Sequence, residues 1–178
     1  MSVRSNSKDN LILETSITLN TLLSDQGYPT DPRKQREVLA CLRTGCRPNI
    51  EKSGPDCYYY ENGEWLPAER KSTDDKHCKG SYTGISNQDT WEEQRALLIK
   101  KVLNMGRHYF DRFDKRTGEL LESWYISGEK AYELLLPDVK KDFDRKKAAL
   151  AAGNGPADPR LRGNISWTQI QKYGTKVI

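Results

Sequence analysis

The sequence predicts an α+β fold that is mainly helical, with two helical arms around a small cysteine-containing β-hairpin segment. Apolar residues recur at helical spacing toward both ends of the chain, and the middle carries the hairpin signal CYYY, ENG, EWL. All four cysteines also fall in this middle part. We expect one helix-rich domain with two attachments: a polar N-terminal arm over residues 1–9, the domain over 10–152 with the cysteine and hairpin segment at 45–88, and an extended C-terminal tail over 153–178.

Three helices are predicted from apolar spacing and from residues that start or stop helices. The first covers residues 10–25, where leucines and isoleucines recur on one side. Asp31 followed by Pro32 begins the second, since proline at the first helical position loses no needed donor, and Gly45 ends it. The third covers residues 90–105, with Trp91 and Leu98 on its apolar stripe.

The hairpins and the last elements follow from turn residues. Asn62 and Gly63 mark the first hairpin, and the KRTG turn at 115–118 marks a second one. Ser127 is expected to cap a short helix, and Pro137 to open a separate helix that reaches Ala152. The tail beyond is expected to be extended, with a last helical turn near Trp167.

Composition limits the class of protein. The 178 residues suffice for one domain, and 35% hydrophobic against 30% charged residues predict a small core with a highly charged surface. The net charge of +4 gives only mild attraction to phosphate-rich partners. Neither a secretory signal nor an apolar run long enough for a bilayer is seen, so we expect no membrane contact and an intracellular location, cytoplasmic or within an assembled particle.

The four cysteines are the candidate metal ligands. In a reducing compartment, a structural zinc ion could join the second helix to a hairpin that lacks a core of its own. The spacing lacks the usual close pairs, so disulfides and ordinary buried thiols remain open, the last being the leading interpretation. No cofactor other than zinc is expected. The candidate zinc ligands are Cys41, Cys46, Cys57 and Cys78.

Basic and aromatic residues gather in two places and form a candidate nucleic-acid-binding set. Cations meet phosphates, and aromatic rings stack on bases. Aspartates interleave with these residues, so a solvated charged surface is the competing interpretation. The set comprises Lys100, Lys101, Arg107, His108, Tyr109, Phe110, Lys115, Arg116, Lys140, Lys141, Arg145, Lys146 and Lys147.

One string resembles a catalytic motif. In PDCYYYENGEWLPAERK, Asp56 is followed across a hairpin by Glu69 and Lys71, which is similar to the PD-(D/E)xK motif of restriction-type nucleases. Two carboxylates and a lysine on adjacent strands can hold Mg²⁺ and orient a water for phosphodiester cleavage. Pro67 argues against this interpretation because proline interrupts a buried strand, and a solvated hairpin end is the alternative.

The function expected first is binding rather than catalysis. The sequence contains no glycine-rich phosphate loop, nucleophile elbow or dinucleotide fingerprint. We expect a non-catalytic interaction or assembly subunit of a larger complex, of the virion or ribonucleoprotein type. Its termini are expected to bind other protein subunits, and RNA or DNA is a further candidate partner. A Mg²⁺-dependent nuclease of the PD-(D/E)xK type and a zinc-braced nucleic-acid-binding protein are the alternatives.

Overall fold

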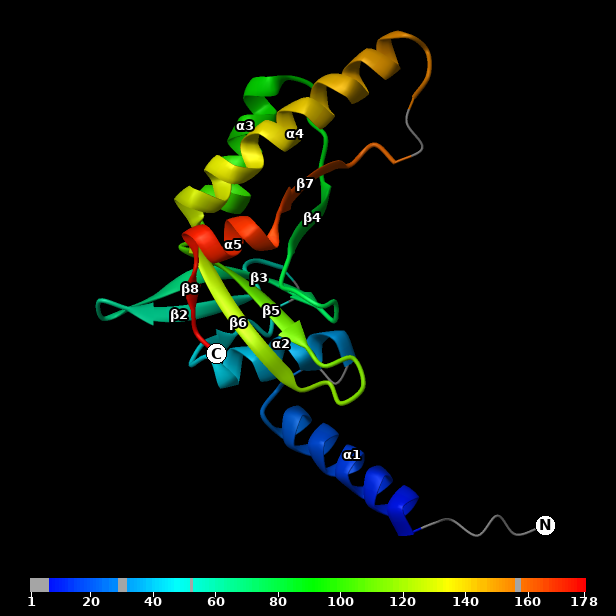
Figure 1. The fold of residues 1–178 in the computed structure, drawn as a ribbon, viewed down its shortest axis with the longest axis vertical. Helices are drawn as coiled ribbons and strands as arrows, with labels where there is room; N and C mark the ends of the chain where they lie inside the picture. Colours follow the sequence, from blue (N-terminus) through cyan, green and yellow to red (C-terminus); the bar gives the residue numbers. More distant parts are fainter. Residues whose placement is uncertain (1–6, 29–31, 52, 156–157) are drawn as a thin grey trace, which may run out of the picture.

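The computed structural model describes residues 7–28, 32–51, 53–155 and 158–178 (Figure 1). The helices are α1 (Ser7–Asp25), α2 (Pro32–Arg43), α3 (Trp91–Leu98), the π-helical η1 (Ile99–Leu103), α4 (Gly128–Ala151) and α5 (Trp167–Tyr173). The strands are β1 (Arg47–Pro48), β2 (Cys57–Glu61), β3 (Glu64–Thr73), β4 (Gly80–Ile85), β5 (Arg107–Phe113), β6 (Leu120–Ser127), β7 (Leu161–Ile165) and β8 (Thr175–Lys176). None of these helices is long and apolar enough to cross a membrane.

A mixed β-sheet organises the molecule, so the prediction of a mainly helical fold around a small hairpin is wrong. The described residues form a six-stranded sheet of order β1-β2-β3-β5-β6-β8 and a second sheet made of β4 and β7. The hairpin β2–β3 is confirmed, but it is braced by β5 rather than left as an isolated pair. Pairing between strands far apart in the chain leaves little local pattern, which is why helical spacing dominated the prediction.

The direction of the strands creates a crossover next to β3. Strands β2 and β3 are antiparallel, β3 and β5 are parallel, and β5 and β6 are antiparallel again. A parallel pair needs a long connection, and here it contains β4, α3 and η1. The crossover therefore places β4 and η1 over one face of β3.

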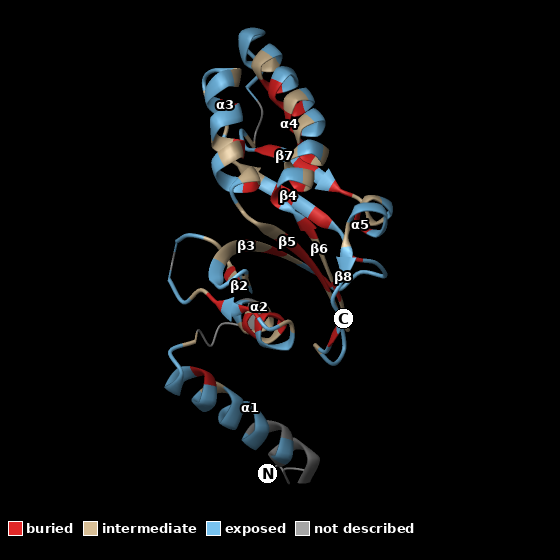
Figure 2. Ribbon diagram, turned by 90° about the vertical axis from the view of Figure 1, so that its left-hand side faces the viewer, coloured by how far each residue is buried: buried red, intermediate tan, exposed pale blue. Residues whose placement is uncertain are grey.

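Helices cover both faces of the main sheet (Figure 2). Alternate residues of β5 serve the two layers: Tyr109 packs with Cys41 of α2, whereas Phe110 packs with Leu98 and Val102 of α3 and η1. Helix α4 and the sheet β4–β7 lie on the same side as α3 (Figure 1). The core thus consists of two apolar layers, one on each side of the main sheet.

Local sequence explains the turn and helix starts that were predicted. Asn62 and Gly63 have φ angles of 51° and 90°, which a two-residue hairpin turn requires. Pro32 is the first residue of α2, as expected. Thr90 caps α3 in a reciprocal capping box with Glu93.

Pro137 does not separate two helices. Helix α4 is continuous from Gly128 to Ala151 with Pro137 inside it, so the prediction of a break there is wrong. Interior proline costs roughly 3 kcal/mol of helix stability. The buried stripe of Ala131, Leu135 and Val139 continues past the proline, and its packing outweighs that cost.

The C-terminal segment differs from the extended tail that was predicted. Strand β7 pairs with β4, α5 follows with a capping box between Ser166 and Gln169, and β8 pairs with β6. Ile178 packs against a small core cluster that includes Phe113. These residues thus complete both sheets, because their partners are strands that lie far earlier in the chain.

Candidate active site

The register of the hairpin brings two carboxylates together. The β2–β3 ladder ends with Cys57 paired with Ala68, and Asp56 precedes this pair while Glu69 follows it. The two carboxylates are close enough that the charge of Asp56 raises the pKa of Glu69, and like charges that close are destabilising. The fold therefore places two carboxylates that repel each other side by side, and a bound cation would reduce this repulsion.

Asp56 is fixed by the backbone of the strand that it faces. Its Oδ2 accepts a hydrogen bond of 2.8 Å from the backbone N–H of Arg70, the residue between Glu69 and Lys71. This bond orients the carboxylate although Asp56 itself lies just before β2. The position of the first carboxylate is thus coupled to that of the strand carrying the second.

Arg70 points to the opposite face of β3 and anchors the strand. Its guanidinium donates two hydrogen bonds of 2.8 Å to Asp111 of β5, and neither side chain is exposed. Ser123 of β6 donates to the same carboxylate at 2.7 Å, and Arg70 donates to Thr44 at 3.1 Å. Because successive side chains alternate, this anchoring directs Glu69 and Lys71 to the other face.

Lys71 and Glu69 form an ion pair in which each side chain is 24% exposed. Burial raises the pKa of Glu69, Lys71 lowers it, and the charge of Asp56 raises it again, which leaves that pKa above its ordinary value. Glu37 of α2 also raises the pKa of Glu69 electrostatically. The effect of Lys71 on the pKa of Glu69 is thus smaller than the combined effects of burial and of the neighbouring carboxylates.

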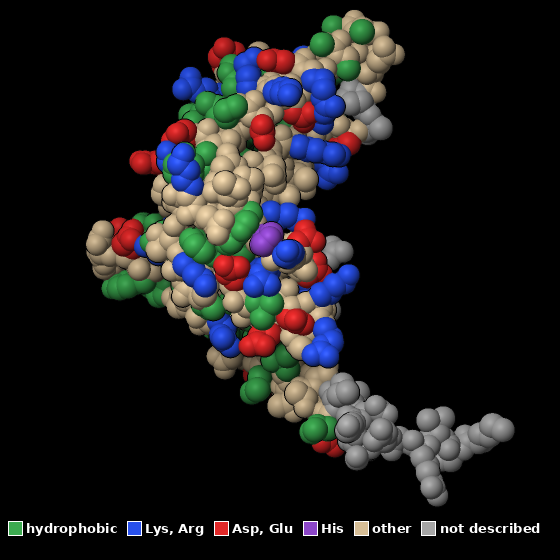
Figure 3. Space-filling model, in the orientation of Figure 1, with side chains coloured by type: hydrophobic (Ala, Val, Ile, Leu, Met, Phe, Trp, Pro, Cys, Tyr) green, Lys and Arg blue, Asp and Glu red, His purple; other side chains and the backbone are tan. Residues whose placement is uncertain are grey.

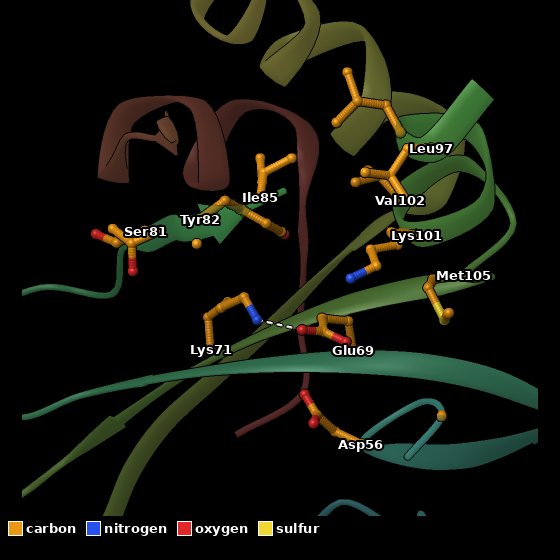
Figure 4. Close-up of a pocket in the computed structure, with 14 residues that line it drawn as sticks. Asp56, Glu69, Lys71, Ser81, Tyr82, Ile85, Leu97, Lys101, Val102 and Met105 are labelled. Atoms are coloured by element: carbon orange, nitrogen blue, oxygen red, sulfur yellow. Dashed lines mark hydrogen bonds and ion pairs between the residues drawn. The ribbon is translucent and has the colours of Figure 1, made fainter. Parts of the chain in front are cut away.

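These residues line a cavity of about 410 Å³ between the main sheet and the crossover segment. Figure 4 shows Asp56, Glu69 and Lys71 on the side of the main sheet, with Tyr82 and Lys101 on the facing side. Lys101 comes from η1, which the crossover places here. One cavity therefore holds two acidic and two basic side chains from three separate segments.

The back of the cavity is uncharged. The hydroxyl of Tyr82 donates to Nδ1 of His108 at 2.8 Å, and Nε2 of His108 donates to the carbonyl of Val102 at 2.9 Å. Burial lowers the pKa of His108 to about 4, so the ring is neutral at neutral pH. His108 therefore serves as a structural hydrogen-bonding residue beneath the site.

A magnesium ion fits the donor set better than zinc does. Among the residues that the structure describes, no group of three or more histidine, cysteine or acidic side chains is placed to hold a metal. Mg²⁺ does not need such a cage, because it is commonly held by one or two carboxylates together with water and substrate phosphates. Asp56 and Glu69 are hard oxygen donors of that kind.

The cysteines lie in two separate places. Cys41, Cys46 and Cys57 pack together against α2, whereas Cys78 packs in the core cluster on the other side of the sheet. All four are buried free thiols, and burial raises the pKa of Cys78 to about 12. Zinc bound by these four residues remains an untested prediction.

The predicted nucleic-acid-binding residues of β5 are mostly interior. His108, Tyr109 and Phe110 are buried, so their rings are not on the surface, and Arg107 lies between the rings of Tyr59 and Tyr125 at 4.2 and 4.1 Å. The other residues of the predicted set lie on η1, in the β5–β6 turn and on α4. They are Lys100, Lys101, Lys115, Arg116, Lys140, Lys141, Arg145, Lys146 and Lys147.

Lys146 differs from the other lysines of α4. It is 4% exposed and donates a hydrogen bond of 3.0 Å to the carbonyl of Asp158. Lys140 lies 5.1 Å from the ring of Trp91, and Lys147 lies 5.3 Å from the ring of Phe143. Contact of the predicted set with nucleic acid stays a prediction, and the exposed lysines are the members able to make it.

Pro67 does not prevent β3 from lying inside the sheet. It pairs with Tyr58 of β2, and its carbonyl accepts from Gly106 at 2.9 Å, just before β5 begins at Arg107. Within a strand, the N–H and carbonyl of one residue point to the same side. The donor that proline lacks thus faces the end of β5, and no bond to β2 is lost.

Sequence reasoning missed the residues that the crossover contributes to the cavity. Ser81, Tyr82 and Thr83 of β4 line it, although the alternation of small and larger residues in GSYTGI was a signal for a half-buried strand. No protein-family model matches this sequence, and no curated protein is significantly similar to it. The geometry of the site is therefore the basis on which a function can be proposed.

Proposed function

We propose that this protein is a Mg²⁺-dependent phosphodiesterase that cleaves a polynucleotide, a nuclease of the PD-(D/E)xK type. The observation that carries the proposal is that Asp56 and Glu69 line one cavity, with Lys71 ion-paired to Glu69 in the same cavity. Two carboxylates held close together are costly to the fold, and groups whose pKa is perturbed in this way concentrate at functional sites.

Each charged residue of the cavity has a separate role in the proposed cleavage reaction. Asp56 and Glu69 hold the cation, and bound Mg²⁺ supplies charge neutralisation and a more acidic water. Lys71, held by Glu69, donates hydrogen bonds that orient the attacking water and stabilise charge developing on the phosphate. Lys101 binds a phosphate oxygen from the facing side, which brings the scissile group between the two walls.

The test is a cleavage assay on duplex and single-stranded DNA and on RNA, with and without Mg²⁺. We expect Asp56→Ala, Glu69→Gln and Lys71→Met each to lower the rate by at least about 100-fold, since each removes a group that acts in the transition state. Glu64→Gln is the matched control, because Glu64 is an exposed acidic residue at the start of the same strand. Melting temperatures close to that of the wild type establish that the variants are folded.

Two outcomes would overturn the proposal. One is wild-type protein that cleaves none of these substrates at any Mg²⁺ concentration. The other is Mg²⁺-dependent cleavage that survives unchanged in the Asp56 and Glu69 variants, which would assign the activity elsewhere in the chain or to a contaminant.

Assembly with other protein subunits is a second candidate function, and α1 is the observation that favours it. Figure 1 shows α1 projecting from the body of the molecule. Leu11, Ile17 and Leu22 on it are 64%, 57% and 59% exposed, and exposed apolar side chains can contribute to association surfaces. Light scattering on the full chain and on a chain lacking residues 1–28 tests this candidate. Monomers in both preparations, with no partner recovered on the full chain, would remove it.

A further inference from the structure

The small sheet β4–β7 has one polar face that is open to solvent. Residues alternate along both strands, so that Tyr82 and Gly163 are buried while their neighbours are exposed. The register pairs Ser81 with Asn164 and Thr83 with Arg162, which gathers these four exposed side chains on one face. This face offers hydroxyl, amide and guanidinium groups, all of which bind phosphate oxygens.

A shallow hollow of about 540 Å³ lies beside this face and extends to α4. The residues that α4 contributes, Asp138, Lys141, Asp142 and Arg145, follow the spacing of one helical stripe. Ser81 and Thr83 line this hollow and also line the cavity of Asp56. The hollow and the candidate active site are therefore neighbours that share β4 as their common border.

The exposed charges of this surface are mostly cationic, because Lys141, Arg145 and Arg162 outnumber Asp138. Asp142 is 9% exposed, and its carboxylate is already neutralised within the protein. It forms ion pairs with Arg145 and with the buried Lys146 at 3.4 Å, and it accepts a hydrogen bond of 3.0 Å from the backbone N–H of Arg162. Arg162 itself is 62% exposed and reaches Asp158 only at 3.3 Å.

Lys141 adds a further exposed cation to this surface. No hydrogen bond or ion pair joins it to another residue in the described ranges. Asp138 is the opposing charge on the stripe. Figure 3 shows several lysine and arginine side chains gathered over α4 and β7.

We infer that this surface binds the sugar-phosphate backbone of duplex DNA that enters the active site across β4, with Lys141 and Arg162 on phosphates next to the scissile one. The inference rests on the proposed function and deepens it by naming the substrate. Charge complementarity and the shared border at Ser81 and Thr83 carry it. Of the residues lining the two hollows, the single aromatic is Tyr82, which is 7% exposed and bonded to His108.

That lining favours a duplex over a single strand. Proteins that bind single strands combine a basic groove with exposed aromatic rings on which bases stack. Here the exposed groups can reach phosphates but present no ring to a base, so the affinity comes from the sugar-phosphate backbone of the nucleic acid. A duplex displays this backbone on its outside and keeps its bases paired inside. Binding is expected to be independent of base sequence at this surface and to weaken as salt rises.

The experiment measures fluorescence anisotropy of a labelled duplex DNA, a matching single strand and a matching RNA, with Ca²⁺ in place of Mg²⁺ so that no cleavage occurs. The test variant is Lys141→Ala/Arg162→Ala. The control is Arg43→Ala/Arg47→Ala, which removes the same charge from exposed positions at the end of α2 and the start of β1. We expect Kd for the duplex to rise about 10- to 100-fold in the test variant, and the slope of log K against log salt to fall by about 2.

The control variant is expected to bind the duplex within about threefold of the wild type. A test variant that binds duplex DNA as the control does, while the wild type cleaves it with Mg²⁺, overturns this inference and leaves the nuclease standing. Tighter binding of the single strand or the RNA than of the duplex overturns the choice of substrate. Normal DNA binding without any Mg²⁺-dependent cleavage overturns the nuclease instead.

Discussion

At the residue scale, the alternation of side chains along β3 places residues that stabilise the fold on one face and residues of the candidate site on the other. Arg70 faces α2 and is held by Asp111, whereas Glu69 and Lys71 face the cavity. A substitution of Arg70 therefore acts on folding, and one of Lys71 acts on the candidate chemistry, although the two residues are adjacent. The three-residue string E-R-K thus carries two independent functions because a strand presents its sides alternately.

His108 gives the residue-scale prediction, which concerns stability as pH falls. Burial lowers its pKa from 6.5 to about 4, so below pH 6.5 the unfolded chain takes up a proton that the folded ring refuses. The stability that the neutral ring contributes is present above pH 6.5 and is lost as pH falls toward 4. The loss attributable to this residue is at most about 3.5 kcal/mol, since each unit of difference in pKa corresponds to about 1.4 kcal/mol.

Urea unfolding between pH 7 and pH 4 measures this effect. His108→Gln is expected to show a smaller loss of unfolding free energy over that range than the wild type, whatever its stability at pH 7. His77→Gln is the control, because His77 is exposed and stacks on Trp167 at the surface. Parallel pH profiles for the wild type and both variants would contradict the assignment.

At the scale of elements, the parallel pairing of β3 with β5 makes the site. It forces a crossover, and the crossover delivers β4 and η1 to the face of β3 that carries Glu69 and Lys71. The ion pair between Arg70 and Asp111 joins the two strands in the layer beneath. This pair therefore sets how firmly β3, which carries Glu69 and Lys71, is held against β5.

Removing one partner of that buried pair is expected to be far more damaging than removing both. Asp111→Asn leaves the Arg70 charge buried without its counterion, which should lower the free energy of unfolding by about 3–5 kcal/mol. The double variant Arg70→Met/Asp111→Leu removes both charges and should recover part of that loss. Denaturant unfolding of the wild type, Arg70→Met, Asp111→Leu and the double variant gives the coupling energy.

Additive losses in that cycle would mean that the two charges do not depend on each other. Lys140→Ala provides the comparison for a surface pair, because Lys140 and Asp144 are 43% and 57% exposed. We expect its effect on the free energy of unfolding to be much smaller, since water screens an exposed pair.

At the scale of the whole molecule, the body and α1 are expected to behave separately. Helix α1 contacts the rest of the protein near its end, where Leu23 is buried and Asn20 accepts a hydrogen bond of 2.7 Å from Gln35 of α2. Leu11, Ile17 and Leu22 are instead exposed to solvent. Among the α1 residues whose side chains the structure describes, none belongs to the cores on either side of the main sheet.

Deleting residues 1–28 is therefore expected to shift the melting temperature of the body by only a few degrees and to leave Mg²⁺-dependent cleavage by the body in place. Calorimetry and the cleavage assay on the truncated chain measure both. Loss of cooperative unfolding in the truncated chain would show that α1 is part of the folding unit.

The sequence by itself determined the local elements and the chemistry of one string. Turn and cap residues such as Asn62, Gly63 and Thr90 act through their own backbone, so the hairpin and the start of α3 were predictable. The spacing of Asp56, Glu69 and Lys71 was also visible in the sequence. Their meeting in a cavity was not, because Pro67 argued against a strand inside a sheet. Proline is tolerated at this position only because β5 begins beside it.

Only the tertiary structure decided the mixed sheet, the continuity of α4 through Pro137 and the supply of Tyr82 and Lys101 to the site. Each of these depends on packing or pairing between segments far apart in the chain, whose free energy outweighs local preference and leaves little trace in local pattern.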